Sequence, residues 1–148
     1  MATVTAHVQA TPAEVFEILA DGWYYPTWVV GTSHVRAVGA DWPAAGSRIF
    51  HASGVWPIVV RDETKVEHSV PAERLVMITR ARPMGEAKVD IILLPEPDGT
   101  SVTMVETPVG GPGRWLHNPL NEALLIRRNV ETLARLTALA EHRSTPST

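Results

Sequence analysis

Hydrophobic and polar residues alternate through most of the middle of this chain, which predicts β-strands with two different faces. Val89 and Ile91, for example, fall on the opposite side from Asp90. Short, turn-rich connections between the stretches predict an antiparallel sheet, and its apolar face needs a covering element. The predicted strands are residues 3–9, 33–39, 47–53, 55–68, 74–82, 86–94 and 100–107.

The stretch 55–68 is the longest predicted strand, and a proline near its start disfavours regular strand pairing there. Its alternation places Trp56, Thr64 and Val66 on one face. Pro57 cannot donate a ladder hydrogen bond, so the first part is expected to be an edge or a bulge.

Helix signals interrupt the strand pattern after the first strand. Thr11 is placed to cap a helix, Pro12 suits the first helical position, and Glu14 completes a capping box. Gly22 is expected to end this helix. The aromatic segment 23–30 then predicts a second short helix broken near Pro26, or a loop.

A long amphipathic helix is predicted over residues 117–142, behind a Gly-Gly-Pro-Gly loop at 110–113. It is the only predicted element long enough to cover the apolar face of the sheet, and the cover is expected to leave a gap. The predicted apolar stripe of this helix comprises Ile126, Val130, Leu133, Leu136, Thr137 and Ala140.

Composition narrows the function classes. The 148 residues carry a formal charge of −3, which gives no electrostatic drive toward nucleic acid. Cysteine is absent, which excludes disulfides, thiolate metal sites and cysteine nucleophiles. No signal peptide or membrane-length apolar run is recognisable, so a cytoplasmic protein without membrane insertion is expected. We expect one domain over 1–143 and a flexible tail over 144–148.

The opening and the turns resemble a known superfamily. The Thr-Pro-Ala-Glu-Val-Phe helix at 11–16, the Pro-x-Trp at 26–28, the Pro-Ala-Glu-Arg-Leu-Val segment at 71–76 and the Pro-Asp-Gly hairpin at 97–99 resemble the START-like, or SRPBCC, superfamily. The subgroup that the chain resembles is the polyketide cyclase/dehydrase and lipid-transport proteins. The resemblance implies an α+β helix-grip fold: a seven-stranded curved antiparallel sheet around a long C-terminal helix, with two short helices after the first strand. It also implies an internal cavity for an apolar or aromatic ligand, and identifies no ligand.

Glu106 and Asn129 are the polar candidates for the cavity. Glu106 continues the inward parity of Val102 and Met104, so it either orients a ligand or acts as an acid or base. The alternatives are exposure to solvent or an ion pair with a nearby arginine. Arg127 and Arg128 are expected to be solvated, although one of them could reach Glu106. Asn129 interrupts or borders the apolar stripe and either bonds a ligand or bonds backbone.

Large side chains are predicted to form the walls. Trp28, Trp56, Met77 and Leu133 are the expected wall residues, and Trp115 is expected to help gate the entrance. Aromatic rings with polar tips suit a pocket that is apolar inside and wet outside. Plain core packing is the alternative for each ring.

Metal and cofactor signatures are missing from the sequence. The six histidines show no HExxH pattern or close pair, so no metal and no cofactor is predicted. His51 or His68 facing the cavity would be a candidate general base. No nucleophile-elbow pattern is found, and no catalytic residue is assigned.

The sequence therefore predicts a protein that binds a small hydrophobic molecule, aromatic or lipid-like, between sheet and helix. The alternative is an aromatase/cyclase-type enzyme acting on a polyketide-like substrate by general acid/base catalysis. A third reading is a dimerising regulatory module with a filled cavity, and a homodimer stays open under each reading.

Overall fold

The computed structural model describes residues 1–30, 32–55, 58–81, 85–111 and 119–144. Seven strands form one antiparallel sheet in the order β1-β7-β6-β5-β4-β3-β2. From β2 to β7, each strand pairs with the next one in the sequence, whereas β1 pairs with β7 and lies at the opposite edge from β2. The strands are β1 (Ala2–Val8), β2 (Thr32–Val38), β3 (Arg48–Val55), β4 (Ile58–Val70), β5 (Arg74–Ala81), β6 (Gly85–Glu96) and β7 (Gly99–Gly110).

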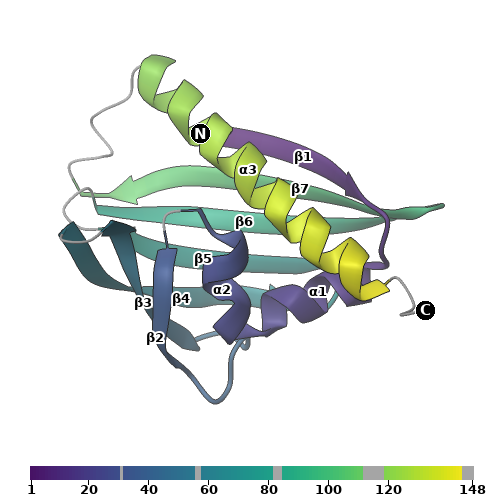
Figure 1. The fold of residues 1–148 in the computed structure, drawn as a ribbon, viewed down its shortest axis with the longest axis horizontal. Coiled ribbons are helices and arrows are strands. Elements are labelled where there is room, and N and C mark those ends of the chain that lie inside the picture. Colours follow the sequence, from purple (N-terminus) through teal and green to yellow (C-terminus); the bar gives the residue numbers. More distant parts are fainter. Residues whose placement is uncertain (31, 56–57, 82–84, 112–118, 145–148) are drawn as a thin grey trace.

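The helices gather on one side of this sheet. The long helix α3 (Pro119–Ser144) runs diagonally over the sheet, and α1 (Pro12–Ala20), the 3-10 turn η1 (Gly22–Tyr24) and α2 (Tyr25–Trp28) lie beside it (Figure 1). The helix-grip fold predicted from the sequence is thereby confirmed, including the two short helices after the first strand. No helix in the described ranges is long and apolar enough to cross a membrane.

One predicted strand boundary is wrong. The stretch 55–68 was expected to be a single strand, whereas Val55 is the last residue of β3 and pairs with Ile58, the first residue of β4. The alternation of the sequence continues across this junction, so periodicity alone does not mark the change of direction. Trp56 lies outside the described residues.

The start of α1 follows its local sequence signals. The Thr11 side chain accepts from the Glu14 amide at 3.2 Å, and the Thr11 amide donates to the Glu14 carboxylate at 3.1 Å. This confirms the capping box, with Pro12 in the first turn. The apolar side of the helix then enters the core through Val15, Phe16, Ile18 and Leu19.

The buried face of α3 differs from the predicted stripe in its N-terminal half. Leu133, Leu136 and Ala140 are buried as predicted, but Ile126 and Val130 are exposed. Asn129 and Thr132 are buried in their place. Each residue turns the helix by about 100°, so a stripe through Ile126 and Val130 lies to one side of the face that meets the sheet. The prediction followed hydrophobicity, whereas this half of α3 turns polar residues inward.

The apolar core therefore fills one end of the space between sheet and helices. Side chains of α1, which contacts α3, β6 and β7, form one buried cluster with inward residues of the sheet such as Leu75, Ile91, Leu93 and Val102. Leu133 is part of this core. The other end of the same space lies under the N-terminal half of α3, where the helix presents amide and hydroxyl groups.

Candidate functional site

A cavity of about 560 Å³ lies between the sheet and the N-terminal half of α3. Its wall combines sheet residues such as Met77, Val89 and Met104 with helix residues such as Leu125 and Thr132. This volume falls within the range usual for small-molecule sites, about 300–1,000 Å³. The third reading of the sequence, a cavity filled by side chains, does not describe this protein.

The predicted site residues divide into three groups. Trp28, Met77, Glu106 and Asn129 line the cavity. Leu133 was expected in the wall but packs in the core, because it sits one turn beyond Asn129 toward the packed end of α3. Trp56 and Trp115 lie outside the described residues. The binding roles of these side chains are taken up below.

Glu106 faces inward from β7 and forms an ion pair with Arg128 of α3. The Arg128 Nη2 atom lies 2.7 Å from Oε1 and 2.5 Å from Oε2 of Glu106. Burial raises the pKa of the Glu106 carboxyl above its ordinary value, and the Arg128 charge acts in the opposite direction. The Glu106 carboxylate in the wall is therefore paired with a cation. An ion pair with a nearby arginine was one of the alternatives that the sequence left open for this residue.

Two side chains in the wall carry polar groups that have no hydrogen-bond partner among the described residues. Asn129 and Trp28 are each only 1% exposed. Within the described part of the chain, Oδ1 and Nδ2 of Asn129 and Nε1 of Trp28 make no hydrogen bond. Leaving a buried polar group unsatisfied costs about 1–3 kcal/mol. Unpaired groups of this kind beside a cavity are typical of a binding site.

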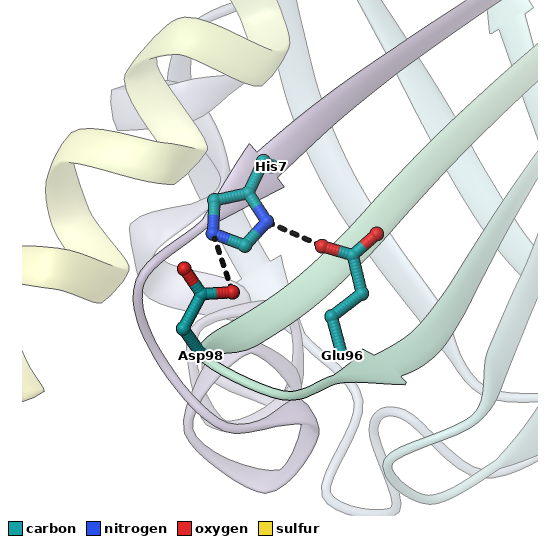
Figure 2. Close-up of side chains that lie close together, drawn as sticks. All are labelled: His7, Glu96 and Asp98. Carbon is teal, nitrogen blue, oxygen red and sulfur yellow. Dashed lines mark hydrogen bonds and ion pairs between the residues drawn. The ribbon is translucent and has the colours of Figure 1, made fainter.

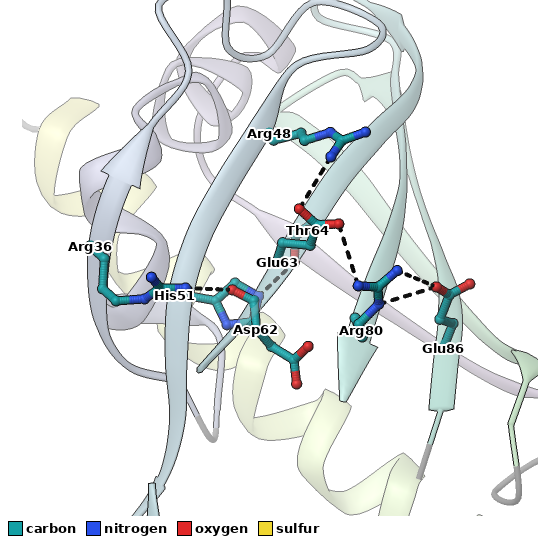
Figure 3. Close-up of polar contacts among 8 residues, drawn as sticks. All are labelled: Arg36, Arg48, His51, Asp62, Glu63, Thr64, Arg80 and Glu86. Carbon is teal, nitrogen blue, oxygen red and sulfur yellow. Dashed lines mark hydrogen bonds and ion pairs between the residues drawn. The ribbon is translucent and has the colours of Figure 1, made fainter. Parts of the chain in front are cut away.

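A buried polar network lies at another part of the wall. The Thr64 hydroxyl is 3.0 Å from the Tyr25 hydroxyl, 2.9 Å from Nε2 of His51 and 3.0 Å from the Thr79 hydroxyl. The Tyr25 ring stacks on the His51 ring, with centroids 5.4 Å apart. Figure 3 shows His51 reaching from β3 to Thr64 on β4. These contacts fix the orientation of the His51 ring.

The protonation of this network follows from its burial. Burial lowers the pKa of His51, and nearby Asp62 opposes that shift. Burial also raises the pKa of the Tyr25 hydroxyl. At neutral pH both groups are therefore uncharged. Of the two histidines that the sequence left open for the wall, His51 lines the cavity and His68 is exposed.

Sequence reasoning missed Tyr25, Thr64 and Thr79 as a group. The parity of β4 puts Thr64 on the inward face, and the ambiguity around Ile49 and Phe50 is resolved with Ile49 buried. That phase turns His51 inward as well. Each position was readable on its own strand, but their meeting depends on the register between strands.

Charged side chains form a second row across neighbouring strands. Glu63 lies 3.4 Å from Arg48 and 3.7 Å from Arg80, and Arg80 lies 3.2 Å from Glu86 (Figure 3). Arg80 and Glu86 border the cavity. Their charges compensate each other, so this part of the wall presents no net charge.

One group in the described residues has the spacing of a metal site, and it lies away from the cavity wall. His7 is 2.5 Å from Glu96 and 3.6 Å from Asp98, at the end of β1 and the β6–β7 turn (Figure 2). All three side chains are exposed. The contacts they make are those of a surface ion-pair cluster.

The chain is similar to a known protein family over nearly its whole length. The family model described as polyketide cyclase / dehydrase and lipid transport matches residues 1–141. No curated protein matches the chain.

Solved structures share the architecture. Protein MLL2253 from Mesorhizobium loti is 17% identical, with 98% of each chain covered and a TM-score of 0.72. TTHA0849 from Thermus thermophilus is 17% identical, with 97% of this chain and 99% of that chain covered and a TM-score of 0.69. The di-domain ARO/CYC StfQ from the steffimycin biosynthetic pathway is 12% identical, with 96% of this chain and 50% of that chain covered and a TM-score of 0.73. At these identities the likeness is one of fold.

The family match spans nearly the whole chain, and the helix-grip architecture and its cavity agree with it. This protein therefore belongs to the SRPBCC-type polyketide cyclase/dehydrase and lipid-transport family.

Proposed function

We propose that this protein binds a small, mainly apolar molecule, aromatic or lipid-like, in the cavity between the sheet and α3. The observation that carries the proposal is the cavity itself, about 560 Å³ with Trp28, Met77, Val89 and Met104 in its wall. Apolar side chains that line a cavity have fewer dispersion contacts with protein atoms on that side. A ligand restores these contacts.

The affinity in this proposal comes from burial of apolar surface. Removing about 200 Å² of ligand surface from water contributes about 5 kcal/mol at 25 cal/mol per Å², before the costs of ordering are subtracted. The polar groups of the wall then set orientation and add hydrogen bonds. Together these contributions support binding in the micromolar to millimolar range for a ligand the size of two or three fused rings.

An aromatase/cyclase-type enzyme is the second candidate. The observation in its favour is His51, an uncharged imidazole held by Thr64 in the cavity wall, which is the form a general base needs. The fold likeness to a di-domain ARO/CYC points the same way. Against it, the Glu106 carboxylate is occupied by Arg128, so acid/base chemistry would first have to break that ion pair.

The binding proposal is tested with the uncharged fluorophore N-phenyl-1-naphthylamine. We expect saturable fluorescence enhancement with the wild-type protein. Ala87 of β6 borders the cavity, so Ala87→Phe should weaken binding about tenfold or more by filling the space. The matched control is Ala37→Phe on β2, at an exposed position outside the wall, which should bind like wild type.

Two outcomes would contradict the proposal: no saturable binding by wild type, or equal binding by the Ala87→Phe and wild-type proteins. Native mass spectrometry of protein purified from its own host gives the ligand class, since a co-purifying molecule is weighed directly. Enzymatic turnover of a polyketide-like substrate that His51→Gln abolishes without loss of affinity would favour the second candidate.

A further inference from the structure

We propose that Asn129 recognises an uncharged planar head group that carries a hydrogen-bond donor beside an acceptor, such as a carboxamide or a lactam. This inference rests on the proposed function, because it assigns a chemical class to the ligand of the same cavity. It deepens that function by naming the group that the helix side of the cavity selects.

The first observation is the state of the Asn129 side chain. It is 1% exposed, lies in the cavity wall, and neither Oδ1 nor Nδ2 has a partner among the described residues. Because neither atom is exposed, the amide has to rotate toward the cavity that the residue borders in order to meet a ligand.

The second observation is that the polar neighbours of Asn129 on α3 are already used. Arg128, the residue directly before it, donates to Glu106. Three residues further on, Thr132 accepts from the Val30 amide at 3.3 Å. The cavity side of α3 is thus organised for hydrogen bonding, and Asn129 is the member whose groups call for a partner outside the described chain.

The chemistry of a primary amide defines what fits. Oδ1 accepts and Nδ2 donates from adjacent positions in one plane. A carboxamide or lactam presents the matching acceptor and donor in the same spacing and closes two parallel hydrogen bonds. Trp28, whose Nε1 is also buried and unpaired among the described residues, belongs to the same cavity wall.

The paired charges of the cavity wall favour a ligand with a neutral head group. Glu106 pairs with Arg128, Glu86 pairs with Arg80, and Glu122 pairs with the Met1 amino group, so these charges of the wall occur in pairs of opposite sign. An anionic head group would compete with Glu106 for Arg128, and a cationic one would compete with Arg128 for Glu106. A neutral amide satisfies Asn129 without breaking any of these pairs.

The test uses three naphthalenes of almost the same shape: 2-naphthamide, which donates and accepts, 2-acetonaphthone, which only accepts, and 2-isopropenylnaphthalene, which does neither. Their dissociation constants are measured by calorimetry on the wild type and on Asn129→Leu. The ratio of the ketone to the amide constant should fall about tenfold or more in Asn129→Leu. Using this ratio cancels the difference in hydration between the two ligands.

The hydrocarbon separates the possible failures. If none of the three ligands binds the wild type, the proposed function fails. If 2-isopropenylnaphthalene binds both proteins and the ketone-to-amide ratio is unchanged in Asn129→Leu, the binding function stands and the assignment to Asn129 is overturned.

A second measurement does not depend on the variant folding. The side-chain amide signals of Asn129 in the wild-type NMR spectrum should shift further downfield with 2-naphthamide than with 2-isopropenylnaphthalene, because only the amide ligand forms the hydrogen bonds. Equal shifts with the two ligands would overturn the assignment.

Discussion

Arg128 on α3 holds the carboxylate of Glu106 on β7 through a single nitrogen that contacts both carboxylate oxygens. The two side chains differ in environment: Glu106 is 7% exposed and Arg128 is 43% exposed. The charge that needs a partner is therefore the buried one, and the helix supplies that partner from the cavity rim. This contact ties α3 to the sheet beside the cavity.

Removing the cation should destabilise the fold. In Arg128→Met the buried Glu106 loses its partner, and we expect the free energy of unfolding to fall by about 1–3 kcal/mol. The measurement is urea unfolding at neutral pH. Arg135→Met is the control, because Arg135 forms an exposed pair with Glu131 one turn away, where the change should stay within about 0.5 kcal/mol. Equal losses in the two variants would contradict a special role for the Glu106 pair.

The carboxyl of Glu106 should give the stability a distinct dependence on pH. Burial raises its pKa in the folded state above the ordinary value of 4.5, so the folded protein binds this proton more tightly than the unfolded chain. The stabilising effect is complete below pH 4.5 and is lost as the pH rises through the folded-state pKa. Relative to Glu106→Gln, the wild type should therefore lose stability as the pH rises from 4.5 through the folded-state pKa of Glu106. A difference that is constant with pH, or that grows with it, would contradict the raised pKa.

His51 should give the stability the opposite dependence on pH from Glu106. Burial lowers its pKa below 6.5, so the unfolded chain binds this proton more tightly than the folded protein. Stability should be complete above pH 6.5 and should fall as the pH drops toward the folded-state pKa. NMR of the ring nitrogens should find His51 still neutral below pH 6.5. A ring that is charged in the folded protein at pH 6.5 would rule this out, and His51→Gln should abolish the corresponding slope in urea unfolding.

The phase of α3 can be tested by two truncations. Leu136 is fully buried, so Leu136→Ala should cost about 2–5 kcal/mol. Ile126 is 38% exposed, and Ile126→Ala should cost less than about 1 kcal/mol, since alanine also favours the helix. Thermal and urea unfolding of the two variants give the comparison. A larger loss for Ile126→Ala would restore the stripe predicted from hydrophobicity.

The sequence by itself determined what depends on neighbours along the chain. The capping box at Thr11 and Glu14 formed as predicted, because its hydrogen bonds join residues three apart. The inward parity of Val102, Met104 and Glu106 also held, because alternation is a property of a single strand. The strand set and the long C-terminal helix then left little choice of fold.

Only the tertiary structure decided how the site is assembled. Tyr25, His51 and Thr64 come from three elements, and their meeting depends on strand register and on where α2 lies against the sheet. The rotation of α3 about its axis also depends on tertiary packing. It buries Asn129 at the cavity wall and exposes Ile126 to solvent, against the hydrophobic pattern. Hydrophobicity predicts which residues gain from burial, but the side of the helix that faces a cavity is fixed by packing elsewhere along its length. In this protein the packed end around Leu136 orients the helix, and the polar face over the cavity follows from that orientation.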